Sequence, residues 1–156
     1  MRKTVALLGI LLAAEASTAA AQAGTLSPQE KQAILGYQLT VPRANQLITA
    51  LDAMTKYVVS LPDFQSWVAK SMKMSAAEKR AQMEGDPKAM AILKQNGLTA
   101  PDYLAGVPAL RMALMAAQGA SGPSIVVSPA NLAFAKSNLK QLKTKMDAAD
   151  GIRPPR

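Results

Sequence analysis

Helix start signals recur along this chain and constrain its fold more than any other feature. Ser27, Pro28 and Glu30 combine an N-cap serine, a first-turn proline and a capping box. Ser75 and Glu78 form a second capping box, and Gly97 fits the left-handed residue that closes a helix. Read in this way, the chain is expected to form helices near residues 28–37, 42–60, 62–73, 76–84, 87–96, 100–118 and 129–148.

The spacing of apolar residues supports this helical interpretation. In segment 42–60 the apolar side chains fill one broad sector, which is typical of a helix packed on a core. Segment 100–118 is apolar on nearly all sides, so we expect its neighbours to enclose it. The sequence therefore predicts an all-α fold, a compact single-domain bundle of six or seven short helices around a central apolar helix, within residues 22–150.

The two ends of the chain differ in character from this domain. Arg2 and Lys3 precede an apolar run over residues 5–14, and two A-x-A sites follow at 19–21 and 21–23. This pattern predicts a cleaved signal peptide over residues 1–21, a mature start at Gln22 or Gly24, and a periplasmic or secreted protein without a transmembrane segment. An uncleaved amphipathic helix is the alternative. Residues 151–156 (GIRPPR) are expected to form a disordered basic tail.

Composition excludes several classes of chemistry. The chain contains no cysteine and no histidine, so disulfides are excluded, and the commonest general base and metal ligand are missing. Residues Ser137 to Lys140 match the S-x-x-K motif of penicillin-binding enzymes, but the chain is too short for that fold and no K-T-G follows. We therefore expect no enzymatic activity, no cofactor and no metal site.

The charge balance bears on possible partners. The chain carries 18 basic and 10 acidic residues, a formal net charge of +8. In an exported protein this excess favours anionic surfaces over nucleic acid, since aromatic residues are too few for a base-stacking platform. Solubility alone is the simpler interpretation.

One candidate ligand site centres on the helix predicted at 100–118. Arg111 is the only charged residue between Tyr103 and Gln118, and Pro108 lies one turn earlier. Arg111 either lies on an exposed strip with Gln118, or it faces the interior beside a kink at Pro108 and pairs with a carboxylate or an anionic ligand. The candidate ligand-binding residues are Arg111, Tyr103, Met112, Met115 and Trp67.

Two further features leave alternatives open. The methionines are expected to fill the core, although thioethers such as those of Met112 and Met115 can also hold Cu(I). Lys136, Lys140 and Lys143 lie beside the apolar stripe of the last helix. There they either contact an anionic surface or form an ordinary solvated flank.

Three stretches resemble small exported all-helical proteins of Gram-negative bacteria that carry a G-L-T-x-x-x-Y turn: residues 92–103, 109–117 and 129–134. The resemblance implies export and a helical fold, and it carries over no catalytic residue.

Together these features predict a non-enzymatic helical binding protein. Its ligand would be an amphipathic or anionic molecule or an envelope component. One alternative is a chaperone-like or envelope protein-interaction module, and another is a small enzyme that works without histidine or cysteine. The sequence does not set the oligomeric state.

Overall fold

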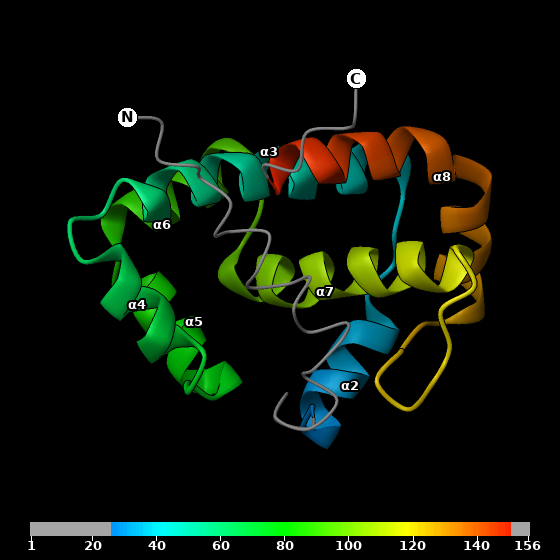
Figure 1. Ribbon diagram of the computed structural model, residues 1–156, viewed down its shortest axis with the longest axis horizontal. Helices are drawn as coiled ribbons and strands as arrows, with labels where there is room; N and C mark the ends of the chain where they lie inside the picture. The colour runs from blue at the N-terminus through cyan, green and yellow to red at the C-terminus, as the bar shows by residue number, and fades with distance from the viewer. Residues whose placement is uncertain (1–25, 151–156) are drawn as a thin grey trace, which may run out of the picture.

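The computed structural model describes residues 26–150. The predicted signal peptide and the predicted basic tail both lie outside the described residues. Within residues 26–150 the chain is all-α, with seven helices and no strand (Figure 1), which confirms the predicted fold class. The helices are α2 (Pro28–Gly36), α3 (Val41–Val59), α4 (Phe64–Ser71), α5 (Ala76–Glu84), α6 (Pro87–Gln95), α7 (Ala100–Ala117) and α8 (Pro129–Ala149). None of these helices is both long and apolar enough to cross a membrane.

The predicted caps account for most of the helix starts. Ser27 and Ser75 form the two expected capping boxes, and Thr99 and Asp102 form a third at the start of α7. Gly97 has φ +66°, the left-handed conformation that the sequence predicted for this position. The chain can therefore reverse between α6 and α7 without strain.

The start of α4 differs from the prediction. The sequence placed this helix from residue 62, but it begins at Phe64, and its N-cap residue Asp63 makes no side-chain capping hydrogen bond. The backbone N–H groups of Ser60 and Leu61 still donate to carbonyls of the last turn of α3. Pro62 therefore falls in the turn between the two helices, and α4 is shorter than expected.

The core forms around α7, which crosses the middle of the molecule with α3 and α8 along one side of it (Figure 1). Eight of its residues are buried, so the enclosure of this helix is confirmed. The four largest fully buried side chains come from four helices: Leu47, Leu93, Leu110 and Leu142. The helix continues through Pro108, which lies inside α7.

Gly106 lets α7 approach its neighbours closely. A Cβ atom at this position would lie 2.7 Å from Cζ of Tyr37 and 2.8 Å from Cδ2 of Leu47. Real side chains do not tolerate such distances without movement of a neighbour. The missing side chain of Gly106 is therefore what allows Tyr37 and Leu47 to pack against α7.

Asn131 fastens the segment between α2 and α3 onto α8. Its Oδ1 accepts a hydrogen bond from the Leu39 backbone N–H at 3.0 Å, and its Nδ2 donates to the Tyr37 carbonyl at 2.7 Å. Only 2% of Asn131 is exposed, and it is the one buried polar residue in the described part of the chain. Both backbone groups thus depend on a side chain more than 90 residues away.

Asn131→Ala is expected to lower the free energy of unfolding by about 2 kcal/mol, because it leaves the buried Leu39 N–H without an acceptor. Urea denaturation followed by circular dichroism measures this loss. Asn138→Ala is the matched control. Its Nδ2 donates only to the Phe134 carbonyl of the same helix, so the change should stay within about 0.5 kcal/mol. Equal losses in the two variants would contradict the role of Asn131.

Candidate functional site

The Arg111 side chain is turned into the domain, where it pairs with Asp150. The distance from Arg111 Nη2 to Asp150 Oδ1 is 2.6 Å, and each side chain is only 15% exposed. Asp150 is the C-cap residue of α8, so the ion pair joins the end of that helix to α7. Of the two interpretations of Arg111, its position agrees with the buried one. Arg111 therefore does not lie on an exposed strip with Gln118.

The electrostatics of this pair follow from its burial. Loss of solvent raises the pKa of the Asp150 carboxyl, although Arg111 acts in the opposite direction. Burial also raises the pKa of the Tyr103 phenol far above its usual range, and the charges of Arg111 and Asp150 both act on it. Tyr103 is therefore a neutral phenol at physiological pH and is a poor candidate for a base.

The remaining candidate ligand-binding residues do not converge with this pair. The Met112 sulfur lies 3.4 Å from the Val126 backbone N–H, which donates to it. Met115 is 39% exposed, and Trp67 belongs to α4 and packs partly against the core. The structure thus gathers Tyr103 and Arg111 around Asp150, and it places Trp67 on another element. Arg111 Nε is buried without a hydrogen-bond partner among the described residues.

The three lysines of the predicted flank on α8 are all exposed, but they differ in their partners. Lys143 pairs with Asp147 at 2.6 Å, whereas Lys136 and Lys140 form no ion pair within residues 26–150. Lys140 also lines a hollow of about 500 Å³ together with Lys145. The Ser137 hydroxyl, four residues after Ala133, donates to the carbonyl of that residue, so it is not held by Lys140.

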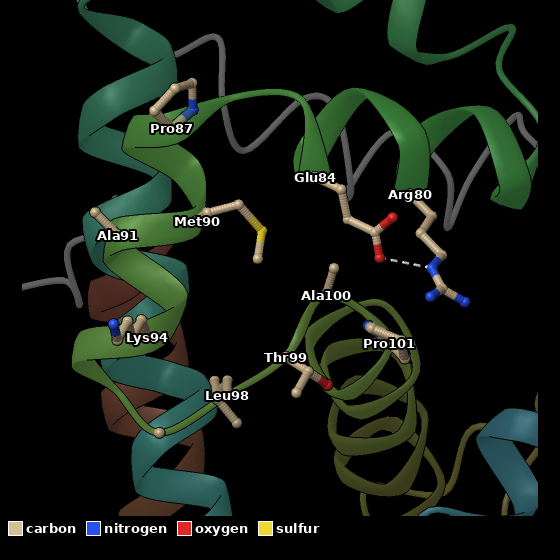
Figure 2. Close-up of a pocket in the computed structure, with 11 residues that line it drawn as sticks. Arg80, Glu84, Pro87, Met90, Ala91, Lys94, Leu98, Thr99, Ala100 and Pro101 are labelled. Carbon is tan, nitrogen blue, oxygen red and sulfur yellow. Dashed lines mark hydrogen bonds and ion pairs between the residues drawn. The ribbon is translucent and has the colours of Figure 1, made fainter.

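A larger groove lies between α5, α6 and the start of α7, and sequence reasoning did not identify it. It encloses about 880 Å³ and brings together three segments that are separate in the sequence. Figure 2 shows Met90 on α6 reaching towards Ala100 on α7, with Glu84 and Arg80 of α5 above them. The lining residues are Arg80, Glu84, Pro87, Met90, Ala91, Lys94, Gly97, Leu98, Thr99, Ala100 and Pro101.

The chemistry of this groove suits binding better than reaction. Its floor is mostly apolar, and Glu84 is its one carboxylate in the described part of the chain. Glu84 accepts a hydrogen bond from Arg80 Nε at 2.7 Å, so it is already paired. The Thr99 hydroxyl is engaged with Asp102 in the capping box. Within residues 26–150 no three His, Cys, Asp or Glu side chains are grouped so that they could hold a metal ion.

Lys94 supplies the cation at the edge of the groove that is free to pair with a ligand. It is exposed and forms no ion pair within the described residues. Neither Met90 nor Ala91 is buried, although both are apolar, whereas Ala89 and Leu93 point into the core. The sequence therefore did carry one signal for the groove: α6 has more apolar residues than one buried helix face requires.

Comparison of the chain with protein-family models, with curated proteins and with solved structures finds no match. What this chain does is therefore inferred from its own residues.

Proposed function

We propose that this chain is an exported, non-enzymatic protein-interaction module of the bacterial envelope. Its groove between α5, α6 and α7 binds an amphipathic segment of another protein, whose apolar side chains contact Met90 and Ala91. An acidic residue of that segment pairs with Lys94. The observation that carries this proposal is the open, mostly apolar groove with an unpaired cation at its edge.

The openness of the groove supports a segment of chain as its occupant. Small-molecule sites usually enclose most of their ligand, whereas grooves that take an amphipathic helix leave one side of it in solvent. Three separate walls, from α5, α6 and the start of α7, suit the contact of an elongated segment better than that of a compact ligand.

Charge supports an acidic occupant. The whole chain is basic, with a formal net charge of +8, which favours encounter with acidic partners. At the groove, Arg80 is neutralised by Glu84 and Lys94 is not neutralised. A carboxylate next to Lys94 therefore gains an attractive contact without breaking an existing pair.

A 14-residue model peptide tests this proposal. The peptide carries leucine at positions i, i+3, i+4 and i+7 and glutamate on its other face, and a second version carries lysine in place of glutamate. Titration into the isotopically labelled protein, followed by amide NMR shifts, should move resonances of α5, α6 and the start of α7. We expect weak binding, with a Kd of about 10 to 100 μM, and at least tenfold weaker binding of the lysine version, since a like charge would then face Lys94.

Ala91→Glu places an acidic side chain in the groove from an exposed position, so the fold should be unaffected while the acidic peptide is repelled. Peptide affinity should fall about tenfold or more, a loss of about 1.4 kcal/mol. Ala133→Glu is the matched control, since Ala133 is exposed on α8 away from the groove. Shifts that scatter over the whole surface, or equal affinities for the two variants, would refute the groove as the binding site.

A further inference from the structure

A second surface, formed by α4 and the turn that follows it, exposes apolar side chains next to lysines. No residue of α4 is fully buried. Met72, at the end of this helix, is 64% exposed, the highest value for any large hydrophobic residue in the described chain. Trp67 and Val68 are partly exposed on the same helix, which lies at one end of the molecule (Figure 1). This tip offers apolar surface that no other part of residues 26–150 covers.

The cations of the tip are free. Lys70 and Lys73 flank Met72 and are both exposed. Neither forms an ion pair within residues 26–150. The nearest acidic residue after them in the sequence, Glu78, accepts hydrogen bonds from the Ser75 backbone N–H and hydroxyl, which occupies it in the capping box. The tip therefore presents an exposed thioether between two unpaired positive charges.

The lysines of α8 provide an instructive comparison. Lys136 and Lys140 are equally exposed and unpaired among the described residues, but the apolar stripe beside them packs into the core. Ala135 and Leu142 of that stripe are 0% and 2% exposed. Lysines alone attract an anionic surface through solvent, whereas apolar side chains beside them can also enter it. Of these two surfaces, the α4 tip is the one that combines both properties.

We propose that the α4 tip docks the protein on the surface of an anionic phospholipid bilayer. Met72 enters the boundary between headgroups and acyl chains, and Trp67 lies at the headgroup level, where its ring contacts apolar chains and its N–H remains hydrated. Lys70 and Lys73 contact the lipid phosphates. This proposal is independent of the groove, since none of these residues lines it.

Trp67 is the only tryptophan of the chain, so its fluorescence reports on this site directly. The probe is a unilamellar vesicle of phosphatidylglycerol and phosphatidylcholine in equal parts, with pure phosphatidylcholine as the neutral comparison. Wild type should show a blue-shifted Trp67 emission with the anionic vesicles, and quenching by lipids brominated near the headgroup. Both effects should be weak with neutral vesicles and should diminish in 0.5 M NaCl. All variants share the same N-terminus, whether or not it keeps the apolar run at 5–14, so differences among variants report on the tip.

Lys70→Gln with Lys73→Gln should lower the vesicle partition coefficient about 25-fold, about fivefold for each lost charge. Met72→Ser should lower it about tenfold, because exposed apolar surface is removed. Lys136→Gln with Lys140→Gln is the matched control and should change it less than threefold. All substituted residues are exposed, and far-UV circular dichroism checks that the helix content is retained.

Two outcomes would overturn the proposal. One is an unchanged Trp67 emission with anionic vesicles that nevertheless bind the protein, which places the contact elsewhere on the chain. The other is an equal fall of the vesicle partition coefficient in the α4 and α8 double variants, which would show that binding depends on net charge alone. Absence of any binding to the anionic vesicles would refute it equally.

Discussion

Asp150→Leu is expected to lower the free energy of unfolding by about 3 to 5 kcal/mol, because it leaves the buried Arg111 guanidinium without a counter-charge. Arginine keeps its proton throughout the ordinary pH range, so this charge cannot be relieved by deprotonation. The two side chains are each 15% exposed and lie 2.6 Å apart, and Arg111 forms no other ion pair within residues 26–150. The loss should be somewhat larger at pH 4.5 than at pH 8, because the raised pKa of Asp150 stabilises the wild-type fold most at low pH.

The reverse change, Arg111→Met, should behave differently because Asp150 can take up a proton. Burial already raises the pKa of Asp150 in the folded protein, and loss of the cation raises it further. A group whose folded pKa is raised stabilises the fold at low pH and loses that contribution as the pH rises through the folded pKa. At pH 4.5, close to the ordinary aspartate pKa of about 3.9, the variant should lose less than about 1 kcal/mol. As the pH rises, the loss of unfolding free energy relative to wild type should then grow by at most about 1.4 kcal/mol per pH unit.

Urea denaturation of both variants at pH 4.5, 6 and 8 measures this asymmetry. Asp150→Asn is a useful intermediate, since it removes the charge but keeps an acceptor for Arg111. If both variants melt within about 0.5 kcal/mol of wild type at every pH, the pair has the energetics of an exposed contact, and its burial does not matter.

Gly106→Leu should lower the free energy of unfolding by about 3 kcal/mol or more, at the upper end of what overpacking costs. The first added carbon would already lie 2.7 Å from Tyr37 and 2.8 Å from Leu47, so the larger side chain must push α7 away from both. Gly106→Ala should be far milder. The Tyr37 ring and the ends of the Leu47 side chain can shift, and alanine improves helix propensity by about 1 kcal/mol.

Gly36→Leu is the matched control for steric conflict. A Cβ at Gly36 would meet no atom within 4 Å, so the added side chain has open space. In thermal melting, Gly36→Leu should unfold near the wild-type temperature and Gly106→Leu many degrees lower. Each kcal/mol corresponds to roughly 4 to 8 °C in a domain of up to about 100 residues, and to somewhat less in this slightly longer domain. Equal melting temperatures for the two leucine variants would show that the close approach at Gly106 is not required.

The helices were predictable from the sequence because their signals are local. Ser27, Ser75 and Thr99 each form a hydrogen bond within three residues of themselves, so the pattern that defines the cap lies in a short stretch of sequence. The start of α4 was misplaced for the same reason. Pro62 suits the first turn of a helix, which would make Leu61 the N-cap residue. The backbone N–H of Leu61, however, still donates to the last turn of α3, so a new helix does not begin there.

The candidate site depends on distant partners, and this is where sequence reasoning fell short. Arg111 stands out in the sequence as an isolated charge, but Asp150 lies next to the predicted tail at 151–156, and nothing local indicates that the two meet across 39 positions. The groove has the same origin. Met90 looks like an ordinary core residue in its own segment, and only the packing of α5 and α6 on α7 leaves it partly exposed in the groove.

The hydrogen bonds of Asn131 also impose an order on folding. The Leu39 N–H and the Tyr37 carbonyl have their partner on α8, so these groups stay unpaired until the chain has been made almost to its end. Synthesis proceeds from the N-terminus, and contacts so distant in sequence close late because the loop between them must first lose its freedom. The segment between α2 and α3 is made early but is therefore among the last of the described residues to be locked in place.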